Sequence, residues 1–198
     1  MKKKVLFFYS FLLIFSSVLA QKPEKLSSNQ IYEQLQKLNF IGSALYIAAH
    51  PDDENTRLIS YLSNNVKART AYLSLTRGDG GQNLIGPEIR ELLGVIRTQE
   101  LLAARNIDGG QQLFTRANDF GYSKHPDETL EIWNKNEVLS DVVWAIRTFK
   151  PDVIINRFNH RTPGTTHGHH TSSAMLSYEA FDVAGRKNEF TNQLKYTE

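Results

Sequence analysis

The 198-residue sequence suits one globular domain, and its 40% hydrophobic and 22% charged content is that of an ordinary soluble fold. The net charge of +2 is nearly balanced and gives no sign of the clustered lysines and arginines that nucleic-acid binding requires. The sequence has no cysteine, so any metal site must be built from His, Asp and Glu, and cysteine-type structural zinc sites are excluded.

The first twenty residues have the pattern of a secretory signal peptide. Three lysines at 2–4 precede an apolar run over 5–15, and small residues end the segment at Ala20. The apolar run is shorter than the roughly 20 residues that a membrane span needs, so we expect cleavage rather than an uncleaved anchor. The mature protein is therefore expected in the periplasm or outside the cell, without stable membrane insertion.

Helical and strand patterns alternate along the rest of the chain. Residues 21–42 are predicted to be a lead-in with a short amphipathic helix over 29–38. Strands are then predicted over 43–49, 68–76, 112–115 and 153–155, and helices over 53–62, 88–106, 129–149 and 168–184. This alternation predicts a layered α/β fold with a mostly parallel sheet flanked by helices.

Two helices carry more detailed expectations. The 129–149 helix is expected to be continuous and to place Trp133 and Trp144 in the core. The 88–106 helix is expected to pack through an apolar side made by Leu92, Val95, Ile96, Leu101 and Leu102. Because 190–198 shows no closing element, the domain over 43–198 is expected to be incomplete at its C-terminal end.

Two clusters of ionisable residues follow predicted strands. His50 and two aspartates come directly after the 43–49 strand, where a helix N-cap would explain one aspartate but not the histidine. After the 153–155 strand, four of the six histidines lie within 160–170, a tract that could by itself be an exposed His-rich loop. The carboxyl ends of parallel strands meet at one edge of a sheet, so both clusters are expected at one metal site.

The available donors indicate the kind of metal. Catalytic zinc sites use three protein ligands and leave a fourth position open, and a set of His, Asp and His is suitable. Donors without thiolate also fit iron or manganese, so Zn²⁺ is predicted with Fe²⁺ as an alternative. A further nearby carboxylate can act as a general base.

The run AHPDDE at 49–54 resembles the signature of the PIG-L (LmbE-like) family of N-acetylglucosaminyl deacetylases, and HGHH at 167–170 is similar to its later H-x-x-H element. The resemblance covers about 43–184, including the glycine-rich loop at 78–83. It implies a Rossmann-like α/β fold and an enzyme that uses a divalent metal, usually zinc. The implied reaction removes an acetyl group from an N-acetylated amino sugar or glycoconjugate.

The resemblance also implies roles at the metal site. His50, Asp53 and His170 match the metal ligands, and Asp52 matches the general base that takes a proton from the attacking water. The common pattern reads H-P-D-H where this chain has HGHH, so the choice between His169 and His170 stays open. Helix geometry favours His170, because it lies one turn from His167.

Other residues are assigned more loosely. The resemblance implies that a protonated His167 stabilises the oxyanion or protonates the leaving amine. Arg97 and Asp119 sit where the family contacts sugar hydroxyls. Glu54 is predicted to support the site or start a helix, and the glycine-rich loop to form a wall of the pocket.

Two other functions remain open at this point. A related amidase could act on a different amide or glycan-linked conjugate, because the metal motif does not fix the substrate pocket. A non-catalytic module that binds carbohydrate or metal would have little use for Asp52 as a free carboxylate. The expected partner is a small molecule or glycan carrying an N-acetyl group, and no nucleic acid.

Overall fold

The computed structural model describes residues 25–197, so the predicted signal peptide at 1–20 lies outside the described residues. The chain divides into two compact units, Met1–Gln36 and Lys37–Glu198. Helix α2 (Ser28–Lys37) confirms the helix expected over 29–38 to within one residue. Its start is capped reciprocally: the Ser27 amide donates to Gln30 Oε1 (2.7 Å), and the Gln30 amide donates to Ser27 Oγ (3.3 Å).

Among the described residues, 25–197, we find no helix with the length and apolarity that crossing a membrane requires.

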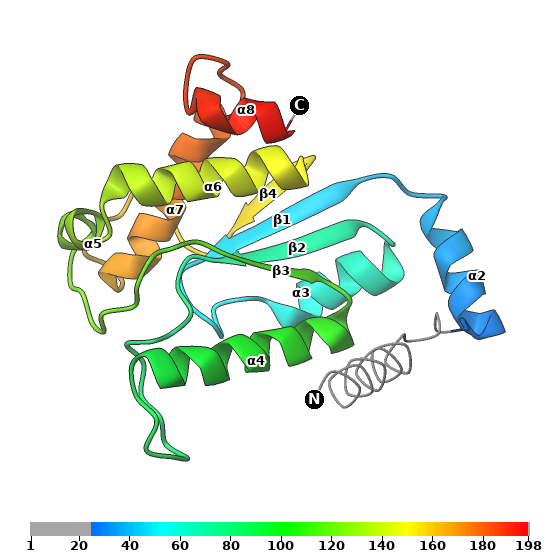
Figure 1. Cartoon of the computed structure of the whole chain (residues 1–198), viewed down its shortest axis with the longest axis horizontal. Coiled ribbons are helices and arrows are strands. Elements are labelled where there is room, and N and C mark those ends of the chain that lie inside the picture. The colour runs from blue at the N-terminus through cyan, green and yellow to red at the C-terminus, as the bar shows by residue number, and fades with distance from the viewer. Residues whose placement is uncertain (1–24, 198) are drawn as a thin grey trace, which may run out of the picture. The chain divides into compact units, whose positions relative to one another are not determined.

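The second unit is built around a four-stranded sheet in the order β3-β2-β1-β4 (Figure 1). Its strands are β1 (Ser43–Ala48), β2 (Arg69–Ser74), β3 (Gln111–Phe114) and β4 (Val153–Asn156). Every neighbouring pair is parallel, and Tyr46 of β1 lies opposite Tyr72 of β2 and Ile155 of β4. The predicted parallel α/β fold is confirmed, with all four strands within two residues of their expected ends.

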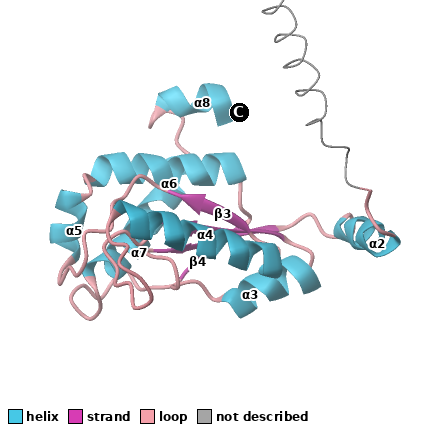
Figure 2. Ribbon diagram, turned by 60° about the horizontal axis from the view of Figure 1, so that its bottom comes forward, coloured by secondary structure: helices cyan, strands magenta, loops and turns pink. Residues whose placement is uncertain are grey.

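The helical elements of this unit are α3 (Thr56–Ser60), the π-helical turn η1 (Tyr61–Asn65), α4 (Glu91–Asp108), α5 (Pro126–Ile132), α6 (Lys135–Phe149), α7 (Gly168–Ala184) and α8 (Thr191–Thr197). Helices cover both faces of the sheet, and Figure 2 shows α6 on one side and α3 on the other. Side chains of β1 alternate between the faces: Leu45 and Ile47 pack with α5, α6 and α7, whereas Tyr46 and Ala48 pack with α3 and α4.

The continuous helix predicted over 129–149 is wrong. The chain instead forms α5 and α6, because Asn134 between them has a φ of 55°. Asparagine is one of the few residues that tolerate this left-handed conformation. Trp133 is buried, as expected, and its indole N–H donates to the Asn118 carbonyl at 2.8 Å. Trp144 is 40% exposed, so its expected place in the core is wrong.

Two other predicted helices begin too early. The helix expected from 53 starts at Thr56, where the Asn55 side chain caps it by accepting from the Leu58 amide at 3.0 Å. The helix expected from 88 starts at Glu91, because Arg90 has a φ of 55° and cannot be helical. The first of these shifts leaves residues 50–55 as a turn.

The apolar side predicted for α4 is partly wrong. Leu101 is buried as expected, but Leu92 is 64% and Val95 is 61% exposed. The buried residues of α4 are Leu93, Gly94, Leu101, Arg105 and Asp108. A glycine and two charged residues on the buried face mislead any reading based on hydrophobic periodicity.

Helix α8 was not expected, because 190–198 carries no clear pattern. It follows a loop fixed by the buried Arg147 of α6, whose guanidinium hydrogen-bonds the Gln193 side chain of α8 at 3.2 Å. The same guanidinium donates to backbone carbonyls of Val183, Ala184, Arg186, Glu189 and Phe190 at 2.9–3.4 Å. These bonds satisfy carbonyls at the C-terminal end of α7 and order the segment after it.

Candidate metal centre

The first part of the site is the turn that follows β1. The Asp53 carboxylate folds back onto His50: its Oδ2 accepts from the His50 amide at 2.8 Å and lies 3.2 Å from His50 Nδ1. The hydroxyl of the buried Tyr72, on the neighbouring strand β2, donates to the His50 carbonyl. A histidine and a carboxylate are thus held together at the carboxyl edge of the sheet.

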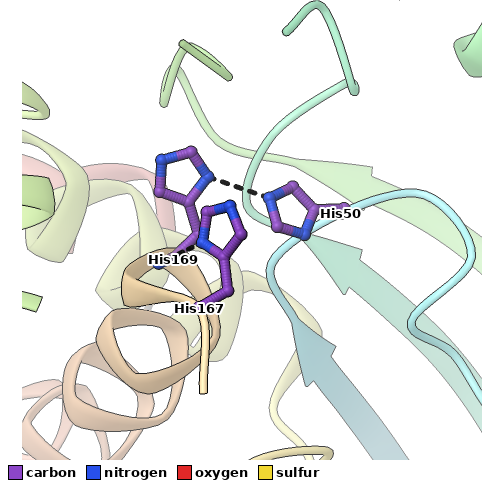
Figure 3. A group of neighbouring side chains, drawn as sticks. All are labelled: His50, His167 and His169. Carbon is purple, nitrogen blue, oxygen red and sulfur yellow. Dashed lines mark hydrogen bonds between the residues drawn. The ribbon is translucent and has the colours of Figure 1, made fainter. Parts of the chain in front are cut away.

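The second part is the start of α7. His167 is the N-cap, and its Nδ1 accepts from the His169 amide at 3.0 Å. Figure 3 shows the rings of His167 and His169 projecting from the start of α7 toward His50. The two clusters predicted from the sequence therefore do meet, although they are more than a hundred residues apart in the chain.

Within residues 25–197, two groups of three residues could hold a metal ion, and both contain His50. One is His50, Asp53 and His170, and the other is His50, His167 and His169; in each, the donor atoms lie within 4.8 Å of one another. Tetrahedral zinc with bonds of about 2.0–2.1 Å separates its ligand atoms by about 3.3 Å. The first group comes near this spacing, since Asp53 Oδ2 lies 3.2 Å from His50 Nδ1 and Asp53 Oδ1 lies 3.6 Å from His170 Nε2.

His169 is placed behind the site rather than in it. The side chain is 0% exposed, and its ring packs against Phe120 and Trp133 at centroid distances of 4.4 and 4.8 Å. Burial is the main cause that lowers the pKa of His169 to about 2, and the nearby His50 is the next cause. The ring is therefore neutral. Its Nδ1 lies 2.9 Å from His50 Nε2, where it can accept a hydrogen bond from a protonated Nε2 and leave the lone pair of His50 Nδ1 for a metal.

His170 and His167 are neutral for similar reasons. Burial lowers the pKa of His170 to about 4, so this ring is deprotonated at pH 7, as metal binding requires. Its ring stacks on Phe158 at 3.9 Å, which fixes its orientation. Burial and then the neighbouring His50 lower the pKa of His167, which disfavours the protonated ring that the resemblance implied. Because Nδ1 of His167 accepts a hydrogen bond, its proton belongs on Nε2.

A pocket of about 380 Å³ opens beside these donors. Of the seven site residues predicted from the sequence, it is lined by His50, Asp52, Arg97, Asp119, His167 and His170. Asp53 is the exception, and its carboxylate contacts the pocket-lining His50. The glycine-rich loop forms part of the wall through Gly78, Gly80 and Gly81, as expected. A side chain at Gly80 would collide with the backbone of Gly121, so the close approach of these loops requires glycine.

Asp52 stands at the pocket in an unusual conformation. Its φ is 89°, and its side chain is 73% exposed. Its Oδ2 accepts from Arg97 Nη2 at 2.7 Å, and the same nitrogen donates to the Pro51 carbonyl at 2.9 Å. Arg97, expected to contact sugar hydroxyls, therefore holds Asp52 in this structure. Asp119 is buried, and its Oδ1 accepts from the Gly121 amide at 2.9 Å.

Some residues of the site were not predicted. Tyr122 lines the pocket with a largely exposed side chain, and its ring lies 5.1 Å from that of His167. Phe158 stacks on His170, and Tyr72 holds the His50 carbonyl. Aromatic residues in loops or strands carry no local pattern of spacing, so only the tertiary structure reveals these contacts.

The fold and the site together define a parallel α/β domain with a His and Asp cluster at the carboxyl edge of its sheet. The chain belongs to the PIG-L family, whose model, described as GlcNAc-PI de-N-acetylase, matches residues 45–181. This confirms the resemblance found in the sequence. No curated protein matched the chain.

Solved structures share the fold. The N,N'-diacetylchitobiose deacetylase of Pyrococcus horikoshii is 17% identical over 88% of this chain, with a TM-score of 0.62. The 4-carboxy-2-hydroxymuconate hydratase GalB of Pseudomonas putida is 17% identical over 75%, with a TM-score of 0.55. A conserved protein of Thermus thermophilus is 21% identical over 76%, with a TM-score of 0.54. The present chain covers 66%, 59% and 60% of these three chains.

Proposed function

We propose that the protein is a metal-dependent hydrolase that removes the acetyl group from an N-acetylated amino sugar or glycoconjugate. The observation that carries this proposal is the convergence of His50, Asp53 and His170 beside a pocket that also contains the carboxylate of Asp52. The family membership supports the acetamide as the bond that is cleaved. The fold neighbour that is a diacetylchitobiose deacetylase agrees with an amino-sugar substrate.

Zinc is the ion that we propose for His50, Asp53 and His170, with Fe²⁺ as the alternative for the same donors. When bound, the ion would lower the pKa of a water molecule and polarise the acetyl carbonyl. His169 would support His50 from behind, where metal sites commonly use a carboxylate or a backbone carbonyl.

The other residues would move protons and stabilise charge. Asp52 would accept a proton from water as its oxygen attacks the acetyl carbon. His167 carries its proton on Nε2, which would donate a hydrogen bond to the carbonyl oxygen as negative charge develops there. The carbon–nitrogen bond then breaks, the proton passes to the leaving nitrogen, and the products are acetate and a free amine. Arg97 and Asp119 would contact sugar hydroxyls.

The N-terminal sequence pattern supports a further part of the proposal. We propose that the chain is exported and acts in the periplasm or outside the cell, on small molecules or glycans that carry N-acetyl groups.

Acetate release tests the proposed function. Protein loaded with Zn²⁺ or Fe²⁺ should release acetate from N-acetylglucosamine, N,N'-diacetylchitobiose or a related N-acetylated sugar. Chelation should abolish this release, and added metal should restore it. Acetate release that persists without metal would contradict metal dependence. A failure to release acetate from any sugar of a broad panel would contradict the proposed deacetylase activity. It would favour a different reaction, because the same fold also occurs in a hydratase.

A further inference from the structure

A buried ion pair lies directly behind the turn that carries Asp52. The side chains of Glu54 and Arg105 are 5% and 4% exposed, and Arg105 Nη2 lies 3.2 Å from Glu54 Oε1. Arg105 comes from α4, whereas Glu54 belongs to the turn between β1 and α3. Burying two charges is costly unless they are well paired and hydrogen-bonded, so this arrangement calls for an explanation.

Arg105 is held rigidly on all sides. Asp108 accepts from its Nε at 3.0 Å and from its Nη2 at 2.6 Å, and Gln112 Oε1 accepts from its Nη1 at 3.1 Å. Its guanidinium also lies over the ring of Tyr72 at 5.4 Å. These contacts restrict the guanidinium of Arg105 to one position, so it is a fixed partner for the Glu54 carboxylate.

The Glu54 carboxylate connects Arg105 to the backbone of Asp52. While Oε1 of Glu54 is paired with Arg105, its Oε2 accepts from the Asp52 amide at 2.9 Å. This bond fixes the backbone of a residue whose φ of 89° is rare outside glycine. The Asp52 side chain itself pairs with Arg97 at the surface of the pocket.

We propose that Glu54, anchored by Arg105, is a positioning residue that holds the backbone of Asp52 so that its carboxylate faces the pocket. The inference rests on the proposed function for its effect on catalysis, but its structural part can be tested without any substrate. In the part of the chain that the structure describes, the Glu54 side chain hydrogen-bonds the Asp52 amide and Arg105 and does not line the pocket, so we expect its effect on catalysis to act through the backbone of Asp52.

The first test uses amide hydrogen exchange of the unaltered protein. The Asp52 amide should exchange at least about 100-fold more slowly than in an unstructured peptide, because it is hydrogen-bonded although its side chain is exposed. Glu54→Met keeps the length of the side chain but removes the acceptor. In this variant the Asp52 amide should exchange at least about tenfold faster than in the unaltered protein. Exchange of the Asp52 amide at the free-peptide rate in the unaltered protein would overturn the proposal, whether or not the chain releases acetate.

The second test uses kinetics with matched variants. Glu54→Met should lower kcat by about 10–100-fold with KM little changed, as expected for loss of a supporting residue. Glu54→Gln keeps one acceptor oxygen, which can serve the Asp52 amide only when its NH2 group faces Arg105, so it should recover part of this loss. Arg147→Met removes a buried charge of α6, on the other face of the sheet from Glu54, and should leave kcat of the folded protein within about threefold. An equal loss of kcat in Arg147→Met and Glu54→Met would show that only the loss of a buried charge matters, and would overturn the positioning role.

Discussion

Replacing Asp52 with asparagine is expected to lower kcat by about 10²–10⁴-fold, the usual contribution of a general base. Asparagine has nearly the same shape and can still accept a hydrogen bond from Arg97, but it cannot take a proton from water. Asp52 is not among the grouped metal donors, so the variant should bind zinc as the unaltered protein does. Acetate release and zinc content, measured on the same preparation, check both parts.

Asp127→Asn is a suitable control for this prediction. Asp127 is also an exposed aspartate, at the start of α5, and it does not line the pocket. Its substitution should leave kcat unchanged. If Asp52→Asn kept activity within about threefold of the unaltered protein, Asp52 would not be the general base, and another group would have to accept the proton.

Replacing Arg147 with methionine is expected to lower the free energy of unfolding by about 3–5 kcal/mol. The guanidinium is buried and bonds backbone carbonyls after α7 together with Gln193 of α8. Methionine fills much of the space but leaves those carbonyls without donors, and each buried unpaired group costs about 1–3 kcal/mol. Urea unfolding of both proteins measures the difference.

Arg116→Met separates the loss of buried bonds from the loss of a positive charge. Arg116 pairs with Glu137 and Asp141, but its side chain is 57% exposed. Exposed ion pairs contribute about 0–1 kcal/mol, so this variant should be nearly as stable as the unaltered protein. If the free energy of unfolding fell equally in the two variants, the buried hydrogen bonds of Arg147 would contribute no more to stability than the exposed ion pairs of Arg116.

The sequence predicts the sheet well because its two central strands, β1 and β2, are short runs that are buried along nearly their whole length. Prediction from the sequence fails where a residue is buried by a contact with a residue that is distant in the chain. The buried face of α4 contains Arg105 and Asp108, whose partners Glu54 and Gln112 lie on other elements. Likewise, no local pattern near Asn134 announces the break between α5 and α6.

The metal site is predictable for a different reason. Its donors belong to two short runs, and the parallel sheet brings the carboxyl ends of its strands to one edge. The sequence alone does not decide between His169 and His170, because the two are adjacent. A helix turns about 100° per residue, so His169 faces the aromatic core while His170 faces the pocket.

The most direct test of the proposed metal centre is a zinc titration of the metal-free protein alongside His170→Ala and His160→Ala. His160 stacks on Tyr178 and is not among the grouped donors, so its variant is a control for the loss of a histidine. The unaltered protein and His160→Ala should each bind one zinc ion per chain, and His170→Ala should bind at least about 100-fold more weakly. If His170→Ala bound zinc as tightly as the unaltered protein, the ion would not be shared by His50, Asp53 and His170, and the proposed enzyme would lose its metal centre.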